Sequence, residues 1–263
     1  DMTIYQTRAG RGKPLLLIHG LGATCRSWET ISPALAGARE VIALDLPGHG
    51  QSPEESDSGT FEGLARSLDD WLSTGGLKGV DMVGSSLGAR LVLEMARRGH
   101  AGAVVALDPG GFWQGWERSF FNTTITASLA LVRALRPALP AITGNVVGRT
   151  ALMAQLSARP WILDPDFVAR ELKSLADTPT VGSLVKDLAN GPMQEGPAKT
   201  SAPIVIGWGR KDRLCLPQQA DRAMSAFPKA KMHWFERSGH FPMWDRPEET
   251  VKVILDATDQ SGS

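Results

Sequence analysis

The chain has 263 residues, of which 42% are hydrophobic and 21% are charged. This composition is typical of a soluble globular protein, and the length allows one large α/β domain that carries an insertion. Lys plus Arg and Asp plus Glu both number 28, so the net charge is zero. The chain therefore lacks the basic excess typical of nucleic-acid-binding proteins, and the absence of long-range steering favours an uncharged or weakly charged substrate.

Targeting and redox signals are weak. No apolar run approaches the ~20 residues that a membrane-spanning helix needs. The first residues, Asp1-Met2-Thr3-Ile4, lack the basic start and apolar stretch of a signal peptide. Cys25 and Cys215 lie far apart in the sequence, which favours two free thiols in a reducing compartment. We expect a cytoplasmic protein without a membrane span.

Short apolar runs alternate with segments of helical pattern in most of the chain. Near-continuous apolar runs are typical of parallel strands buried on both faces. Six such runs occupy residues 14–18, 41–44, 80–83, 103–107, 203–208 and 231–235. Helical spacing or an opening proline predicts helices at 61–72, 87–98, 217–227 and 247–255. This alternation predicts an α/β fold with a doubly wound, mostly parallel sheet.

The alternation stops in the middle of the chain. Residues 112–200 contain helical segments, loops and aromatic residues but no convincing buried strand. We expect a helical cap at 112–200, inserted into a core made of residues 1–111 and 201–263. Aromatic side chains that could line a pocket are Trp113, Trp116, Phe120, Trp161 and, after the last strand, Trp244. The alternative for each is simple packing of the cap onto the core.

A serine in a glycine-flanked turn is the strongest candidate for chemistry. Ser86 is the central residue of the sequence Gly84-Ser85-Ser86-Leu87-Gly88, between a predicted strand and a predicted helix. A sharp strand–turn–helix connection exposes such a serine as a nucleophile and needs glycines because the neighbouring backbone is close. The helix N-terminus would also stabilise developing negative charge. The alternative role for Ser86 is an ordinary helix N-cap.

A serine nucleophile needs a base, and the base needs a carboxylate. Among the five histidines, His240 is distinguished by its place after the last strand and before the final helix. Asp212 follows the preceding strand, which gives the chain order Ser, Asp, His. Asp108 is a rival acid because it ends the strand after the serine turn, although a role in shaping the turn at Asp108-Pro109 is favoured.

Backbone N–H groups should stabilise the oxyanion of such a reaction. The residue after the nucleophile, Leu87, supplies one. The loop His19-Gly20-Leu21-Gly22, after the first buried strand, is expected to supply the other from Leu21, because its glycines allow the N–H to turn inward. The alternative is a plain glycine turn. The reaction needs no metal or organic cofactor, and the scattered histidines do not indicate a zinc site.

These residues together resemble the α/β-hydrolase superfamily in its serine-nucleophile, capped, carboxylesterase-like form. The resemblance covers nearly the whole chain outside the cap. Its motifs are the loop at His19, the segment Asp45-Leu46-Pro47-Gly48-His49-Gly50, the Ser86 turn, the segment Trp208–Asp212, and Gly239-His240. Asp45 and His49 are architectural residues in the superfamily. The resemblance implies hydrolysis of a carboxylic ester by Ser86, His240 and Asp212.

Other members of the superfamily remain as alternatives. Epoxide hydrolases and haloalkane dehalogenases use an aspartate nucleophile, whereas Ser86 stands here, and Tyr5 is the one tyrosine available for epoxide opening. Lactonases, perhydrolases, carbon–carbon hydrolases and lyases share the serine. Arg90 is similar to an arginine of the menaquinone-pathway lyase, but an exposed helix arginine is expected. A ligand receptor that keeps the triad is the non-enzyme alternative. Oligomeric state is left open.

Overall fold

The computed structural model describes residues 4–259, which form one seven-stranded sheet surrounded by helices. The strands follow the order β1-β3-β2-β4-β5-β6-β7, and only β1 runs antiparallel to its neighbour. Their bounds are β1 Gln6–Ala9, β2 Pro14–Ile18, β3 Glu40–Leu44, β4 Asp81–Ser85, β5 Val104–Leu107, β6 Ile204–Gly209 and β7 Lys231–Phe235. The predicted fold class, a doubly wound and mostly parallel sheet, is confirmed.

The six predicted strands correspond to β2 through β7, and β1 is the strand that the apolar pattern missed. Its sequence, Gln6-Thr7-Arg8-Ala9, is polar and largely exposed because β1 lies at the edge of the sheet. An edge strand needs no continuous apolar run, so hydrophobicity alone does not reveal it.

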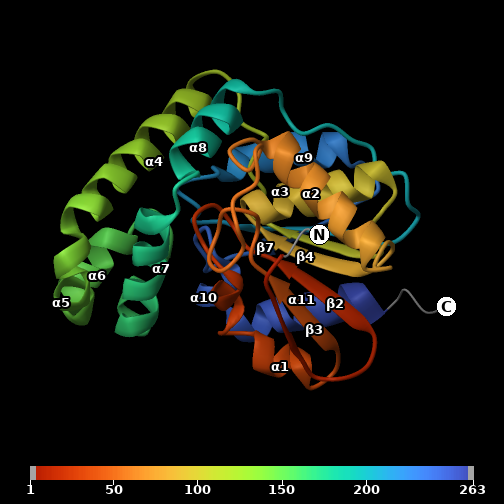
Figure 1. Cartoon of the computed structure of the whole chain (residues 1–263), viewed down its shortest axis with the longest axis horizontal. Coiled ribbons are helices and arrows are strands. Elements are labelled where there is room, and N and C mark those ends of the chain that lie inside the picture. Colours follow the sequence, from red (N-terminus) through yellow and green to blue (C-terminus); the bar gives the residue numbers. More distant parts are fainter. Residues whose placement is uncertain (1–3, 260–263) are drawn as a thin grey trace.

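The alternating residues of the buried strands divide the core into two layers. In β2, Leu16 and Ile18 pack on one side of the sheet, and Leu15 and Leu17 pack on the other. The first side is covered by α2 (Phe61–Thr74), α3 (Leu87–Arg98) and α9 (Ala220–Ala226), and the second by α1 (Ser32–Ala36) and α11 (Pro247–Asp259) (Figure 1). The short helices η1 (Cys25–Trp28), η4 (Pro217–Gln219) and α10 (Pro242–Asp245) complete this part.

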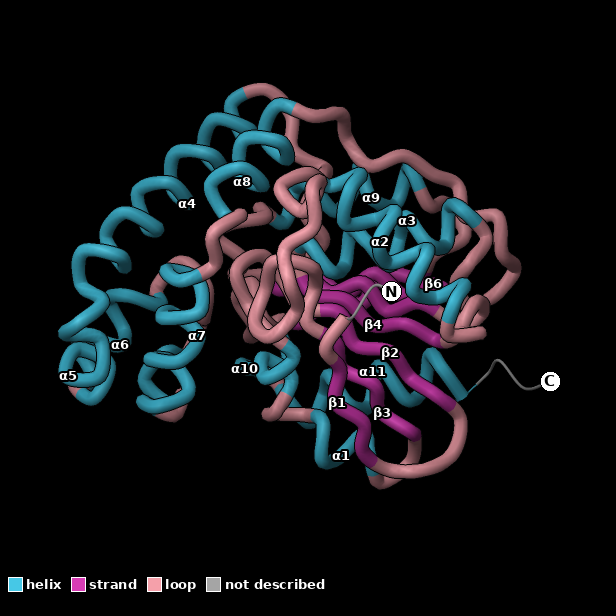
Figure 2. Tube along the Cα trace, viewed as in Figure 1, coloured by secondary structure: helices cyan, strands magenta, loops and turns pink. Residues whose placement is uncertain are grey.

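A helical insertion lies between β5 and β6 and stands beside the sheet (Figure 2). Its helices are α4 (Trp116–Leu135), η2 (Arg136–Ala138), α5 (Leu139–Gly144), α6 (Val146–Met153), η3 (Pro160–Ile162), α7 (Pro165–Asp177) and α8 (Val181–Asn190). We call this segment the α4–α8 insertion. In α4, the buried residues are spaced three or four apart, so that one face packs inward: Phe121, Ile125, Leu129 and Val132.

One result corrects the expectation about apolar length. The helical run Trp116–Gly144 has 29 residues and a mean hydropathy of 1.3 over its most apolar window, which is long and apolar enough to cross a membrane. A single helix that meets these criteria is weak evidence for a membrane span, and α4 packs one face against the rest of the protein. The outward face is unusually poor in charge, since the run Ser119–Val132 contains no charged residue.

A buried carboxyl group joins the insertion to the core. Glu171 of α7 is buried and accepts a hydrogen bond from Ser27 Oγ of η1, with 2.7 Å between the oxygens. Burial raises the pKa of Glu171 to about 7, against the opposing effects of the Ser27 hydrogen bond and the positive charge of Arg170. This contact therefore changes its protonation near neutral pH.

The variant Glu171→Gln should become more stable than the wild type as pH rises. The carboxyl of the unfolded chain loses its proton near about pH 4.3, whereas the folded carboxyl keeps it until about pH 7. The stability due to Glu171 is fully present below the lower value and is lost as pH rises through the higher one. At about pH 8 the variant should exceed the wild type by about 1–3 kcal/mol in the free energy of unfolding, measured with urea.

The matched control is Glu248→Gln, which makes the same change at an exposed carboxylate. The free energy of unfolding of Glu248→Gln relative to the wild type should be similar at about pH 5 and about pH 8. If the difference between Glu171→Gln and the wild type is also the same at both pH values, the folded Glu171 has no raised pKa and the prediction is wrong.

Candidate active site

The turn that carries Ser86 has a backbone conformation that few residues other than glycine adopt. Ser86 has φ 54° and ψ −110°, between the end of β4 and the start of α3. A Cβ atom on Gly84 would lie 2.1 Å from the carbonyl oxygen of Gly88, and one on Gly88 would lie 2.1 Å from that of Ile18. Both glycines are therefore required by space, as the sequence indicated.

The Ser86 hydroxyl belongs to a series of hydrogen bonds. It makes no cap hydrogen bond to α3, and its Oγ lies 2.9 Å from Nε2 of His240. Nδ1 of His240 lies 2.8 Å from Oδ2 of Asp212. With the imidazole proton on Nδ1, the ring donates to Asp212 and accepts from Ser86. The three side chains predicted from sequence therefore meet in space, and the N-cap alternative for Ser86 lacks its hydrogen bond.

Asp212 is held as an acceptor by backbone groups as well as by His240. Its Oδ1 accepts hydrogen bonds from the N–H groups of Leu214 and Cys215, at 2.8 Å and 3.0 Å. Three donors thus converge on a carboxylate that is almost completely buried. Hydrogen bonds of this kind favour the charged form of a carboxyl group, which is the form that can stabilise a histidine cation.

The α4–α8 insertion supports the loop that carries His240. The N–H of His240 donates to the carbonyl oxygen of Leu156 at 3.0 Å. Asp245, which is buried, accepts at Oδ2 from the N–H groups of Gly239 and Ala158, both at 2.8 Å. Ser157 Oγ donates to the other oxygen of Asp245. These residues were not predictable from the sequence, since no motif connects a position near 157 with one near 245.

Two other histidines lie near the Ser86 turn but serve the framework. Nε2 of His19 accepts a hydrogen bond from the N–H of Leu46, and the rings of His19 and His49 are 5.1 Å apart. Burial lowers the pKa of His19 to about 4 and that of His49 to about 3. Both rings are therefore neutral near pH 7, which suits the architectural role that the resemblance implied for His49.

The His19–Gly22 loop packs directly against the Ser86 turn. A Cβ on Gly20 would lie 3.3 Å from both the carbonyl oxygen of Ser85 and Cβ of Ser86. Leu21 of this loop and Leu87 of α3 both line the cavity beside Ser86. Among the described residues, neither backbone N–H takes part in the turn, loop and cap hydrogen bonds. The two residues therefore lie at the wall of the cavity into which Ser86 opens.

Ser86 and His240 open into a small, mostly apolar cavity of about 70 Å³. Its walls come from the sheet edge and from α4, α7 and α8 of the insertion. Trp113, one of the predicted pocket residues, lines it and stacks on Phe121 with 4.1 Å between the ring centroids. Ile125 follows Phe121 by one helical turn. The apolar spacing of α4 could have identified these two residues from the sequence.

The other four aromatic residues predicted to line the pocket lie outside this cavity. Trp116 and Trp161 are 62% and 53% exposed, so they face solvent. Phe120 packs edge-on against Trp116, with centroids 6.0 Å apart, on the same outer part of α4. Trp244 is buried but stacks behind the cavity residue Phe241, at 4.0 Å. The prediction is corrected for these four, because an aromatic residue in an insertion has no fixed direction without the helix orientation.

Arg90 also differs from its expected position. The sequence favoured an exposed helix arginine, whereas Arg90 is buried and lines the cavity. Its Nε and Nη2 donate to Gln194 Oε1 and to the carbonyl oxygen of Pro192, at 3.2 Å and 3.0 Å. The guanidinium also lies 4.1 Å from the ring centre of Phe61. Burial lowers its pKa to about 10, so Arg90 remains a cation near pH 7.

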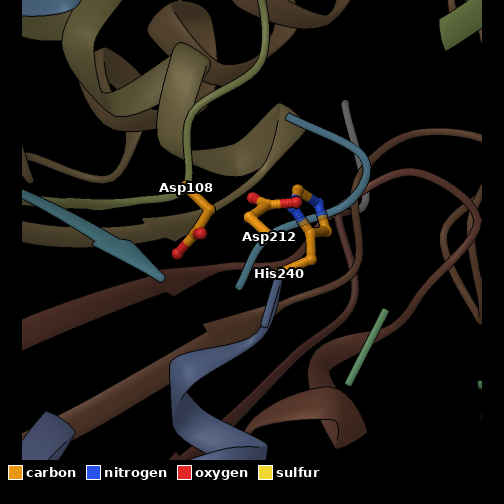
Figure 3. A group of neighbouring side chains, drawn as sticks. All are labelled: Asp108, Asp212 and His240. Atoms are coloured by element: carbon orange, nitrogen blue, oxygen red, sulfur yellow. The ribbon is translucent and has the colours of Figure 1, made fainter. Parts of the chain in front are cut away.

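Asp108 lies in the same cluster as Asp212 and His240 (Figure 3). One donor atom from each of the three residues lies within 4.8 Å of the others, which is close enough to hold a metal ion. Both ring nitrogens of His240 are already used, however, by Asp212 and Ser86. The arrangement therefore fits a proton-transfer site better than a metal centre.

A larger cleft, of about 630 Å³, lies between η3, α7 and the α10–α11 region, and neither Ser86 nor His240 lines it. We locate the site by the hydrogen-bonded side chains rather than by volume, because chemistry requires groups in contact.

The chain is similar to known proteins over nearly its whole length. The chain is 30% identical to the uncharacterized protein Rv2715 of Mycobacterium tuberculosis, over 95% of this chain and 77% of that protein. It is 26% identical to 2-hydroxy-6-oxononadienedioate/2-hydroxy-6-oxononatrienedioate hydrolase 1 of Dechloromonas aromatica, over 97% of this chain and 90% of that protein. A thermophilic esterase from Thermogutta terrifontis shares the fold, with a TM-score of 0.77, 19% identity, and coverage of 99% and 94%. The family model described as the alpha/beta hydrolase family matches residues 15–253, and the chain belongs to this family of hydrolases.

Proposed function

We propose that this protein is a serine hydrolase that cleaves a carboxylic ester of a small to medium, largely uncharged molecule through an acyl-enzyme. The observation that carries the proposal is the unbroken series Ser86–His240–Asp212, with 2.9 Å and 2.8 Å between the bonding atoms, at the wall of an apolar cavity. The small cavity and its apolar walls favour a short, apolar acyl group next to Ser86.

In the first step, Ser86 Oγ attacks the ester carbonyl carbon while Nε2 of His240 takes the hydroxyl proton. Asp212 keeps the imidazole oriented and stabilises its cation. The carbonyl oxygen becomes an oxyanion, and the N–H groups of Leu21 and Leu87 donate to it. Each such donor contributes on the order of 3 kcal/mol to the transition state.

In the second step, the tetrahedral intermediate collapses, and His240 returns the proton to the leaving alcohol. A water molecule then attacks the acyl-enzyme while His240 takes one of its protons, and His240 gives this proton to Ser86 Oγ as the bond to the acyl group breaks and the acid is released. Every step uses groups of this chain.

We further propose that residues 112–200 act as the cap, since α4, α7 and α8 wall the cavity, and that residues 1–111 and 201–263 form the core.

The cytoplasmic location is part of the same proposal. Its support is limited to the thiols, since Cys25 and Cys215 are both free and buried. Such cysteines are typical of proteins in a reducing compartment.

One observation favours a second candidate, a carbon–carbon hydrolase of anionic substrates. Arg90 is the one Arg or Lys side chain that lines the cavity. The Dechloromonas aromatica relative is by name a hydrolase of dioates, which carry two carboxylates. A guanidinium in an apolar cavity is suited to such a group. A kcat/KM for 2-hydroxy-6-oxononadienedioate at least about 100-fold above that for the best ester would replace the first proposal with this one.

The variant Ser86→Ala tests the nucleophile. The wild type should release p-nitrophenol from short or medium p-nitrophenyl esters, in a series from acetate to long chains. The variant should lose about 10³-fold or more in kcat/KM, because only the oxyanion donors and binding remain. Its melting temperature should stay near that of the wild type, since the Ser86 hydroxyl caps no helix.

A variant that retains more than about a tenth of the activity would contradict the assignment of Ser86. Little or no ester cleavage by the wild type would instead leave the carbon–carbon hydrolase, the lyase or the receptor as the function.

The variant Ile125→Ala tests whether α4 limits acyl length. The Ile125 side chain lines the cavity, so its truncation should shift the preferred ester by about two or more carbons toward longer chains. The matched control is Trp116→Ala on the same helix, whose exposed side chain should have no effect on chain-length preference. Profiles of kcat/KM against chain length give the answer, and equal shifts in both variants would show that α4 acts by general loosening.

A further inference from the structure

The wild-type site contains a second buried carboxyl group that the proposed mechanism does not use. Asp108 follows β5 and is completely buried. Its own N–H donates to the carbonyl oxygen of Gly207 at 2.8 Å, and its Oδ2 accepts from the N–H of Gly209 at 2.9 Å. Asp108 is thus fastened to β6, the strand whose end leads to Asp212.

The backbone of Asp108 is strained, with φ 47°, and only it and Ser86 have positive φ among the described non-glycine residues. Such conformations cost free energy and persist where the surroundings hold them. Here the strained residue carries its carboxyl group in the same cluster as Asp212 and His240 (Figure 3).

The second oxygen of Asp108, Oδ1, has no hydrogen-bond partner among the described residues. The titratable groups that act on Asp108 are Asp212 and Asp245, which are both acidic, and His240 and Cys215 complete the surroundings. An ionised carboxylate with an unpartnered buried oxygen and two acidic neighbours would be very costly. Two carboxyl groups this close and this buried cannot both be charged.

The distribution of donors decides which group holds the proton. Asp212 accepts from Leu214 N–H, Cys215 N–H and His240, whereas Asp108 accepts only from Gly209 N–H. The charge therefore resides on Asp212 and the proton on Asp108. Burial, followed by the negative charge of Asp212, holds the pKa of Asp108 well above its usual range.

We propose that Asp108 is a positioning residue for Asp212: in its neutral, protonated form it donates a hydrogen bond from Oδ1 to the Asp212 carboxylate. This inference rests on the proposed role of Asp212 beside His240. The donor fixes the orientation of Asp212 and reduces its basicity. Asp212 then accepts the hydrogen bond from Nδ1–H of His240 and orients the imidazole without removing that proton. Asp108 itself touches no substrate and accepts no proton during turnover.

Two variants separate this role from a general structural one. Asp108→Asn keeps an oxygen for Gly209 N–H and supplies an N–H donor to Asp212, without any charge. Asp108→Gly removes both groups but accepts the positive φ, as asparagine also does. The asparagine variant therefore reproduces the neutral acid, whereas the glycine variant lacks the donor.

The first readout is the rate at which a fluorophosphonate probe labels Ser86, followed against pH. Ser86 Oγ forms a bond to phosphorus, fluoride leaves, and His240 takes the hydroxyl proton, so the rate reports the triad without needing an ester substrate. Without the donor, Asp212 pulls more strongly on the His240 proton. In Asp108→Gly the rate should fall about tenfold, and its acid limb should move to higher pH. Asp108→Asn should stay within about twofold of the wild type with an unmoved acid limb.

The second readout needs no chemistry at all. Folded Asp108 keeps its proton, whereas the unfolded carboxyl releases it near about pH 4. The stability due to this group is therefore present at low pH and is lost as pH rises. The urea midpoint of Asp108→Asn minus that of the wild type should grow steadily from about pH 4.5 to about pH 7.5.

Several outcomes would overturn the inference. One is a difference in urea midpoint between Asp108→Asn and the wild type that stays constant across this pH range. Another is a labelling rate of Asp108→Asn as low as that of Asp108→Gly. A third is a labelling rate of Asp108→Gly equal to that of the wild type. No labelling of the wild-type protein would remove the role of Asp212 and the inference with it. Normal labelling with the expected variant pattern but no ester cleavage would uphold Asp108 while the ester proposal fails.

Discussion

The site depends on one strained turn at the carboxyl end of β4. Ser86 holds a positive φ there, and the turn needs Gly84 and Gly88 because a Cβ at either position would clash with neighbouring backbone. β4 lies in the middle of the sheet, next to β2 and β5. The parallel register then brings the ends of β2, β5 and β6 to the same edge, so that the residues following each strand surround the serine.

The loop that carries His240 is positioned by hydrogen bonds, some of which involve the helical insertion. The N–H of His240 donates a hydrogen bond to the carbonyl oxygen of Leu156. Asp245 accepts hydrogen bonds from both Gly239 of the core and Ala158 of the insertion. Gly239 fits closely, since a Cβ there would lie 2.9 Å from the N of Ala158. Lifting this corner of the insertion would remove the support of the His240 loop. The insertion thus supports the His240 loop and also forms part of the cavity wall.

Much of this arrangement was predictable from sequence because it depends on local patterns. Six strands followed from apolar runs, and Ser86, Asp212 and His240 followed from their places after β4, β6 and β7. The remaining features depend on the direction in which a side chain points, which local patterns do not give. Trp116, Phe120 and Trp161 lie on the wrong face of their segments for the cavity, and Trp244 lies behind Phe241. Arg90 was placed outside because helical charge usually faces solvent, whereas the return segment at Pro192–Gln194 covers it. The pairing of residues near 157 and 245 has no sequence signal at all.

Net charge was the least informative property of the sequence, and the structure explains why. The burial that forms the site also determines which of its groups can be charged. His19, His49, Glu171 and Asp108 all have pKa values displaced toward their neutral forms. Arg90, in contrast, remains a cation near pH 7, because burial lowers its pKa only to about 10 and it donates to Gln194 and Pro192. In an apolar cavity a single fixed charge acts over a longer range than many charges on a solvated surface. A chain with balanced surface charges can therefore present a single fixed charge to its cavity, and substrate charge has to be inferred from Arg90, which lines that cavity, rather than from the composition.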